Sequence, residues 1–236
     1  NGLDNNGDYD PSDTDSLVSK MVEIIVNMVK EEPSENAQYL MLGHADYYAQ
    51  CKCDHCKELY KKFGENFSGL QAAWANAVVR EAKKRLADEG VDRPVKFVIF
   101  AYSKSIAAPV KEGPDGTWIP LDERVVLDDS IVVKMAWRNC ANHSLWDTSC
   151  EQNEVKRKEF QQWATLAKEF AIWDYTCNFS DFLWYLPDYG VLRENYSYYK
   201  ELNVKHLLTQ GTPSEYNYYE YFLKAYVSLK LMWNVN

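Results

Sequence analysis

The sequence YLMLGHADYYAQCKCDHC, residues 39–56, decides the fold class that we expect for this chain. It begins with four apolar residues of the kind that form a buried strand, and it runs directly into Gly43, His44 and Asp46. A loop with three cysteines follows. Parallel α/β enzymes build their sites where apolar strands release ionisable side chains at their carboxyl ends. The stretch therefore predicts a parallel α/β fold with a functional loop after this strand.

Strand and helix patterns alternate about five times along the chain. Apolar segments of strand length follow at residues 95–102, 131–137, 170–175 and 204–208. Apolar residues at helical spacing lie between and around them, with Ser68, Asn153 and Ser214 as candidate N-caps. The sequence GPDG at residues 113–116 predicts a hairpin turn within a long connection. This alternation is typical of βα units around a parallel sheet.

The number of units predicts only part of a barrel. Right-handed βα units close into a barrel, and a complete (β/α)₈ barrel has eight strands in about 250 residues. We therefore predict one α/β domain over residues 1–236, the C-terminal part of a TIM-type barrel with about five βα units; an open α/β sheet is the alternative. Residues 1–13, rich in Asn, Asp and Gly, are expected to be flexible.

The composition bears on the partners of the chain. A net charge of −9 argues against nucleic acid, which requires clustered basic side chains. No run of 18 apolar residues is present, so we expect no membrane span. The first residues do not resemble a signal peptide, and a mature secreted protein would look the same. Aromatic residues make up 14% of the chain; they can line a sugar-binding cleft or simply pack in the core.

The strand ends predict one shared set of polar and aromatic side chains. If the strands are placed correctly, this set consists of His44, Asp46, Tyr102, Arg138, His143, Trp173, Asp174, Tyr175 and Gln210. No glycine-rich turn leads into a helix, so the sequence gives no indication of phosphate binding. Asp46 and Asp174 are the carboxylates best placed for acid–base catalysis on a glycosidic bond, which requires a pair. Asp174 could instead hydrogen-bond a loop.

The six cysteines leave three interpretations open. Cys51, Cys53 and Cys56 can present three thiolates to Zn²⁺, with His55 or a distant cysteine as the fourth ligand. In an oxidising compartment Cys140 could pair with Cys150, which would leave Cys177 for the first cluster. All six could also be reduced thiols. In each case we expect the cysteines to be structural rather than nucleophilic.

An ordered series of motifs resembles a known family. The series consists of the strand and Asp before CKCDHC, then CANHSLWDTSC (140–150), IWDYT (172–176), LLTQG (207–211) and YFLKAYVSLKLMWNVN (221–236). It is similar to a bacterial domain family of unknown function whose members are grouped with secreted TIM-barrel glycoside hydrolases. Those proteins often carry an N-terminal domain like that of alpha-glucuronidases.

The resemblance implies a glycosidase-like barrel whose earlier strands or N-terminal domain lie upstream in the same protein. Asp46 and the three clustered cysteines fall on the Asp and the cysteine cluster of the family, and residues 173–175 fall on its W-x-Y strand. Gln210 lies near an acidic or amide position of the family. Because it is Gln rather than Glu, a catalytic carboxylate from this segment is in doubt.

The function we predict is a glycoside hydrolase-like domain that acts on or binds a polysaccharide or an acidic oligosaccharide. Asp46 would be one catalytic carboxylate, Arg138 or His143 would orient an acidic sugar, and Tyr102, Trp173 and Tyr175 would form stacking walls. The alternatives are a non-catalytic carbohydrate-binding module and a structural domain clamped by zinc at the cysteines. No other cofactor is required, and we expect a secreted, periplasmic or cell-surface protein.

Overall fold

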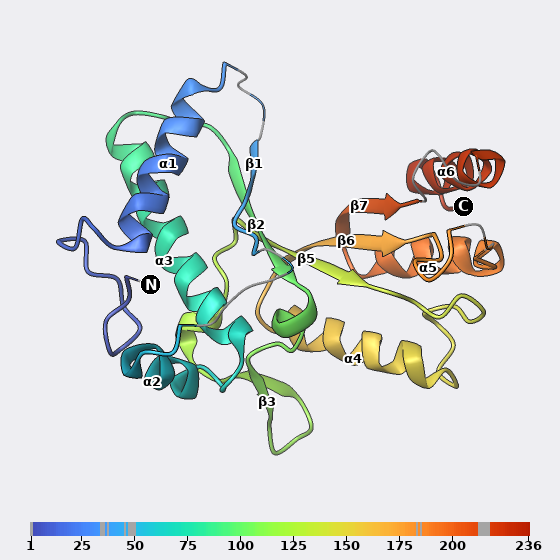
Figure 1. Cartoon of the computed structure of the whole chain (residues 1–236), viewed down its shortest axis with the longest axis horizontal. Coiled ribbons are helices and arrows are strands. Elements are labelled where there is room, and N and C mark those ends of the chain that lie inside the picture. Colours follow the sequence, from blue (N-terminus) through green and yellow to red (C-terminus); the bar gives the residue numbers. More distant parts are fainter. Residues whose placement is uncertain are drawn as a thin grey trace. The chain divides into compact units, whose positions relative to one another are not determined.

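The computed structural model describes residues 2–33, 36, 38–44, 46, 51–182, 184, 186–211 and 218–236 (Figure 1). The chain forms two compact units. The first unit comprises Asn1–Val133 with Gln161–Lys168, and the second comprises Lys134–Phe160 with Glu169–Asn236. Because the boundary falls within strand β5 (Ile131–Trp137), this strand contributes residues to both units.

The first unit contains three helices, two sheet strands and a hairpin. In chain order these are α1 (Leu17–Glu31), β1 (Gln38–Met41), α2 (Asp54–Lys62), α3 (Phe67–Asp88), β2 (Val95–Ala101), β3 (Val110–Glu112) and β4 (Trp118–Pro120). Helix α1 begins at the N-cap Ser16, whose side chain accepts a hydrogen bond from Ser19 N at 3.1 Å. Its buried apolar residues pack against α3, whose own buried face is rich in alanine and valine. Small side chains allow the two helices to approach closely.

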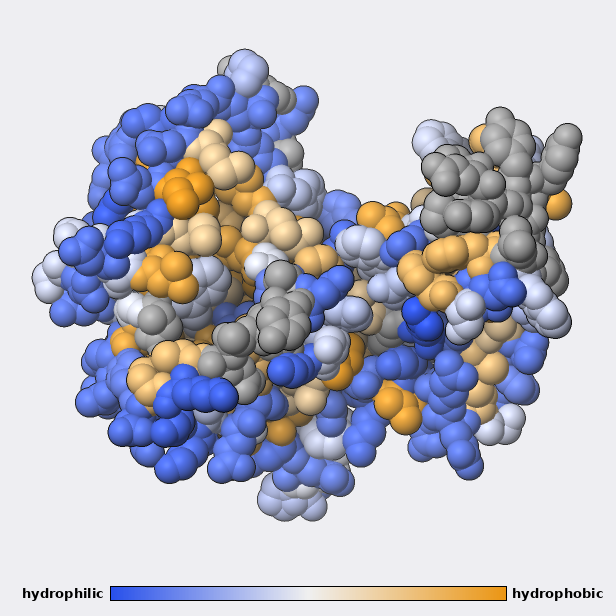
Figure 2. All heavy atoms as spheres, in the orientation of Figure 1, coloured by the Kyte–Doolittle hydropathy of each residue, from blue (hydrophilic) through white to orange (hydrophobic). Residues whose placement is uncertain are grey.

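Helix α1 also carries apolar residues away from that contact. Leu17, Ile24 and Met28 are each 52% exposed. They lie seven and four residues apart, so they share one face of the helix. Figure 2 shows hydrophobic side chains at the surface over α1 and α3. The helix is thus apolar on two faces, only one of which is buried.

The second unit contains the later strands and helices. Helix α4 (Glu151–Ala164), whose last turn belongs to the first unit, precedes β6 (Glu169–Tyr175), α5 (Tyr189–Glu201), β7 (Val204–Gln210) and α6 (Tyr218–Trp233). Strands β6 and β7 run parallel, with Trp173 opposite Leu208 and Tyr175 opposite Gln210. Along β6, Ile172 and Asp174 are buried while Trp173 and Tyr175 are partly exposed. The two faces of β6 therefore have different surroundings.

The strand order is that of consecutive barrel strands. The five-stranded sheet has the order β1-β2-β5-β6-β7, and the pairs β1–β2 and β6–β7 are parallel. A doubly wound α/β sheet reverses its strand order at a switch point, and no reversal occurs here. The mixed α/β fold, with six α-helices in the described ranges, is compatible with part of an α/β barrel. The five strands of this sheet are those expected from the sequence.

The predicted hairpin is confirmed, and two helix starts differ from the expected ones. Strands β3 and β4 pair antiparallel, and Gly116 has φ 78 in the turn between them. Helix α3 begins at the N-cap Asn66, whose Oδ1 accepts from Gly69 N at 2.9 Å; the prediction of Ser68 as its cap was wrong. Asn153 lies within the first turn of α4. Ser214 lies outside the described residues.

Residues 2–13, expected to be flexible, form a loop with defined contacts. Leu3 pairs with Tyr9 in an antiparallel bridge, and Leu3 is only 4% exposed. The Tyr9 hydroxyl lies 2.8 Å from Ser19 Oγ, and Arg124 Nε donates to Asp8 Oδ1 at 2.8 Å. Among the helices of the described ranges, none combines the length and apolar character needed to cross a membrane.

Candidate functional site

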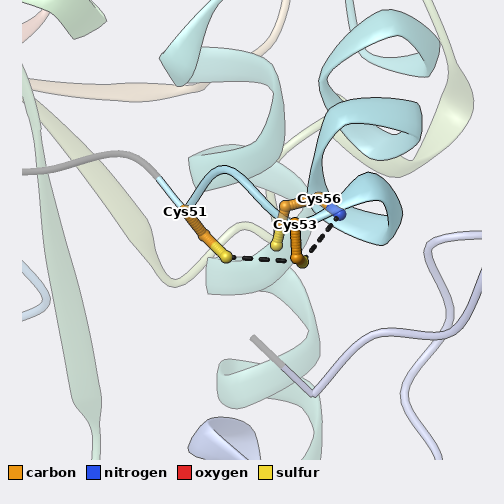
Figure 3. Close-up of side chains that lie close together, drawn as sticks. All are labelled: Cys51, Cys53 and Cys56. Atoms are coloured by element: carbon orange, nitrogen blue, oxygen red, sulfur yellow. Dashed lines mark hydrogen bonds between the residues drawn. The ribbon is translucent and has the colours of Figure 1, made fainter.

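The cysteine-rich loop of the first unit brings three thiols together (Figure 3). The sulfur atoms of Cys51, Cys53 and Cys56 all lie within 4.8 Å of one another, and all three cysteines are free. Cys53 is the N-cap of α2: its Sγ lies 3.4 Å from Cys51 Sγ and accepts from Cys56 N at 3.4 Å. Three clustered sulfur donors suit Zn²⁺ or another thiolate-binding metal.

The three thiols differ in acidity because their surroundings differ. Burial, together with hydrogen bonds to the other two sulfurs, raises the pKa of Cys56 to about 12. Cys51 is exposed, and hydrogen bonds from the backbone and side chain of Cys53 lower its pKa. A cysteine binds a metal ion as its thiolate, so metal binding would release protons from this cluster.

His55 does not complete the cluster. Its Nδ1 lies 2.8 Å from Asn5 Oδ1 and its Nε2 lies 2.8 Å from the Leu3 carbonyl oxygen. Both ring nitrogens are therefore occupied by the N-terminal loop, and the prediction of His55 as the fourth ligand was wrong. Within the described ranges the donor set at this loop comprises the three thiols alone.

A largely apolar cavity of about 300 Å³ lies beside the cluster in the first unit. Its lining includes His44, Cys51, Phe67, Gln71 and Trp74. Gln71 Oε1 and Trp74 Nε1 are buried and have no hydrogen-bond partner among the described residues. Unpaired buried polar atoms are costly. These two buried polar atoms belong to residues that line the cavity.

His44 is held in the first unit by Ser105 and by aromatic rings, among them Tyr102 and Phe67. Its Nε2 lies 2.9 Å from the Oγ of Ser105, a fully buried residue in the turn after β2. Its ring stacks on Tyr102 at 6.5 Å between centroids and meets Phe67 edge-on at 5.5 Å. His44 and Tyr102 are thus neighbours, as expected. Asp46 is exposed in the same unit.

In the second unit, cationic and aromatic side chains pair on β5 and β6 and just after the ends of these strands. Lys134 Nζ lies 4.6 Å from the centroid of the Trp173 ring. The guanidinium carbon of Arg138 lies 5.4 Å from the centroid of Tyr175 and 5.0 Å from that of Phe179. These distances are typical of cation–π contacts. We call Lys134, Arg138, Trp173, Tyr175, Phe179 and Gln210 the cation–aromatic face.

Gln210 belongs to this face through a direct hydrogen bond. Trp173 Nε1 donates to Gln210 Oε1 at 2.7 Å. This bond fixes the orientation of the indole ring and leaves the Gln210 amide NH₂ as a donor. Burial lowers the pKa of Lys134, so its charged form is disfavoured by its surroundings. An anion bound beside this lysine would favour the charged form.

Asp174 lies on the opposite face of β6. It is 4% exposed, and Asn139 Nδ2 donates both to its carboxylate at 3.3 Å and to the hydroxyl of Tyr199 on α5 at 2.7 Å. Burial, followed by the negative charge of Asp188, raises the pKa of Asp174 to about 7. The carboxyl group is therefore largely protonated in slightly acidic solution.

The predicted residues fall into separate groups. His44, Asp46 and Tyr102 belong to the first unit; Arg138, His143, Trp173, Asp174, Tyr175 and Gln210 belong to the second. Of these, the structure brings His44 into contact with Tyr102, Arg138 with Tyr175, and Trp173 with Gln210. Exposed His143 instead contacts Cys140. The arrangement of all nine residues on one edge stays a prediction.

Sequence reasoning missed Lys134, Phe179, Ser105 and Asn139. The lone lysine within the apolar segment 131–137 was a usable signal, because lysine is rare in buried strands unless its charge is paired. Ser105 and Asn139 gave no such signal. Their roles depend on partners that are distant in the sequence.

The comparisons with known proteins identify a family. The family described as Domain of unknown function (DUF4838) matches residues 14–236, so the chain belongs to this family. No curated protein and no solved structure matches the chain.

Proposed function

We propose that this DUF4838 domain binds an oligosaccharide that contains acidic sugars, on the cation–aromatic face of its second unit. The observation that supports the proposal is the pairing of each cation with a ring: Lys134 with Trp173, and Arg138 with Tyr175 and Phe179. Aromatic rings pack against the C–H faces of sugars, and guanidinium and ammonium groups bind carboxylates.

The electrostatics of the face favour an anionic ligand over a neutral one. Burial disfavours the charge on Lys134, and a sugar carboxylate nearby would offset that penalty. Exposed Arg138 can offer a planar pair of donors to the same or a neighbouring carboxylate. The Gln210 amide, positioned by its bond to Trp173, is suited to a sugar hydroxyl.

Calorimetric titration with uronic-acid oligosaccharides tests this proposal. Arg138→Gln should weaken binding by roughly 10- to 150-fold, since a hydrogen bond to a charged group contributes about 1.5–3 kcal/mol. Arg193→Gln is the matched control: this exposed arginine donates to the Val235 carbonyl, away from the face. Carboxyl-reduced oligosaccharides should bind more weakly. Equal affinity for both ligand types, or for both arginine variants, would exclude the acidic-sugar site.

Hydrolysis is a further proposal, for which Asp46 of the first unit and Asp174 of the second unit are separate candidates. A glycosidase needs a protonated acid and a second carboxylate at the scissile bond. The raised pKa of Asp174 suits an acid, but this buried side chain lies on the face of β6 opposite the cation–aromatic face and contacts Asn139, as a structural group would. Loss of turnover with retained binding in Asp46→Asn and Asp174→Asn would support catalysis. Full turnover by Asp46→Asn would remove that residue from the mechanism.

A second candidate function, a zinc-clamped structural domain, is favoured by the Cys51, Cys53 and Cys56 cluster. Zinc bound there would tie the loop after β1 to the start of α2. Chelator treatment of the zinc-loaded protein should then lower its melting temperature, and Cys53→Ser should abolish that response. His55→Gln, which removes a histidine engaged by the N-terminal loop, should retain it. An unchanged melting temperature on chelation would exclude the clamp.

A further inference from the structure

We propose that Cys140, His143 and Cys150 form a separate metal site in the second unit, suited to Zn²⁺ or a similar divalent ion that binds thiolates. One donor atom from each residue lies within 4.8 Å of the other two. Cys140 Sγ lies 3.1 Å from His143 Nδ1. Both cysteines are free thiols. The site is independent of the sugar-binding proposal and of the cysteine cluster in the first unit.

The donor distances fit a tetrahedral ion after small movements. Zn–S bonds of about 2.3 Å and Zn–N bonds of about 2.0–2.1 Å place two sulfurs about 3.8 Å apart and a sulfur and a nitrogen about 3.5 Å apart. The distance between Cys140 Sγ and His143 Nδ1 would lengthen slightly from 3.1 Å. The distance between the two sulfurs, which is at most 4.8 Å, would shorten by no more than about 1 Å. Two thiolates also balance the charge of a divalent ion. A Cys₂His set is among the known zinc ligand sets.

The backbone between the ligands is fixed by a buried amide. Asn153, which is 0% exposed, donates from Nδ2 to the carbonyl oxygens of His143 at 2.9 Å and Ser144 at 3.0 Å. Its Oδ1 accepts from the backbone N–H of Cys140 at 3.0 Å. One side chain on α4 therefore positions two of the three ligand residues. Such positioning reduces the ordering cost of metal binding.

Side chains on α4 and α5 hydrogen-bond the backbone of the remainder of the loop. Arg157 Nη1 donates to the carbonyl oxygens of Leu145 and Asp147, each at 2.9 Å, and Asn195 Oδ1 accepts from Leu145 N at 2.7 Å. Cys150 lies immediately before α4, where its carbonyl accepts the helical hydrogen bond from Glu154 N at 2.9 Å. The third ligand is thus also attached to a rigid element.

The site leaves one coordination position to solvent. His143 is exposed and Cys140 is half-buried, so an ion can reach the donors. In the described ranges no fourth His, Cys, Asp or Glu joins this donor group. Asp147, the nearest acidic residue in the loop sequence, accepts at Oδ1 from the backbone and hydroxyl of Ser149. A metal here would have three protein ligands and one exchangeable ligand, as open zinc sites do.

Cobalt titration of the reduced full-length chain tests the site. Co²⁺ bound by thiolates gives a charge-transfer absorption that oxygen ligands do not give. The variant Cys51→Ser/Cys53→Ser removes two exposed ligands of the first cluster and should still bind one equivalent of Co²⁺ with this absorption. Adding Cys140→Ser should abolish the absorption. Cys177 lies outside both donor groups, so adding Cys177→Ser in place of Cys140→Ser should leave the absorption unchanged.

A second measurement needs no substitution at the site. Zn²⁺ should protect Cys140 and Cys150 of the unmodified chain from alkylation, as mapped by peptide mass spectrometry. The proposal is overturned if the doubly substituted chain gives no charge-transfer absorption, if the absorption persists in Cys140→Ser, or if Zn²⁺ leaves the alkylation of both cysteines unchanged. A disulfide between Cys140 and Cys150 that resists reduction in the folded protein would also overturn the proposal.

Discussion

Lys224 Nζ lies 2.8 Å from Asp188 Oδ1, and the lysine is only 4% exposed. The same ammonium group donates to the carbonyl oxygens of Thr176 at 3.0 Å and Leu186 at 2.9 Å. This one side chain therefore links α6 to the segment between β6 and α5. The outer surface of α6 carries exposed apolar residues, among them Leu229 and Trp233. The buried ion pair is thus a main polar attachment of this helix to the second unit.

We predict that Lys224→Met lowers the free energy of unfolding by about 3–5 kcal/mol, because it leaves Asp188 buried without its cation. Urea unfolding followed by circular dichroism measures the change. Lys230→Met, at an exposed position on the same helix, should change stability by no more than about 0.5 kcal/mol. Similar stabilities for the two variants would contradict a structural role for the pair. The double variant Lys224→Met/Asp188→Asn should recover part of the loss.

Asp174 gives the stability of the second unit a predicted pH dependence. Its folded pKa, raised to about 7 by burial and by Asp188, exceeds the unfolded value of about 3.9. Between these values the folded state retains a proton that the unfolded state has released. The contribution of this group to the free energy of unfolding therefore falls as pH rises from about 4 to about 7, and it does not change further above about pH 7.

Asp174→Asn should remove this fall, because an amide does not titrate. Between pH 5 and pH 8, the free energy of unfolding of the variant should rise relative to that of the wild type by about 2–3 kcal/mol. Urea midpoints at the two pH values measure the difference. Glu194→Gln, which removes an exposed carboxylate on α5, should follow the wild-type profile. Parallel profiles for Asp174→Asn and wild type would show that Asp174 does not titrate in this range.

Ser105 supports His44 and the turn after β2, so its removal should destabilise the first unit. Its Oγ lies 2.8 Å from the Phe100 carbonyl oxygen and accepts from Tyr102 N at 3.1 Å. Ser105→Ala should cost about 1–3 kcal/mol, the penalty for unpaired buried groups. Ser103→Gly is the control: Ser103 is exposed with φ 53, so glycine should be neutral or stabilising. Thermal melts compare the two variants.

The sequence predicted the elements because each pattern is local. An apolar segment such as residues 95–102 can form a buried strand whatever its neighbours, and GPDG predicts a turn by the conformations that Gly and Pro allow. Helix starts were less certain, because several polar residues can cap. Asn66 and Ser68 both precede the apolar face of α3, and only the folded backbone shows that Asn66 is the cap.

The candidate site was only partly predictable, because its groups depend on contacts between distant segments. The partnership of Trp173 with Gln210 follows from the parallel alignment of β6 and β7, and the sequence had placed both residues at strand ends. The orientation of Asp174 depends on alternation along β6, and it faces away from Trp173. Asn153 matched a cap pattern while its amide holds the loop of Cys140. No local pattern distinguishes these two roles.

The corner between α2 and α3 requires a residue without a side chain. A Cβ atom on Gly69 would lie 1.9 Å from the carbonyl oxygen of Phe63, and Phe63 is fully buried. Because the obstacle is backbone, the helices would have to separate. Gly69→Ala should therefore lower the melting temperature by roughly 10 °C or more, corresponding to a loss of several kcal/mol.

Gly190→Ala is the matched control for this prediction. Gly190 lies in the first turn of α5, and a Cβ there meets nothing within 4 Å. Alanine favours helices over glycine by up to about 1 kcal/mol, so this variant should be neutral or slightly more stable. Differential scanning calorimetry of the two variants gives the comparison. If Gly69→Ala and Gly190→Ala have the same melting temperature, α2 and α3 do not pack as closely at that corner as they do in the structure.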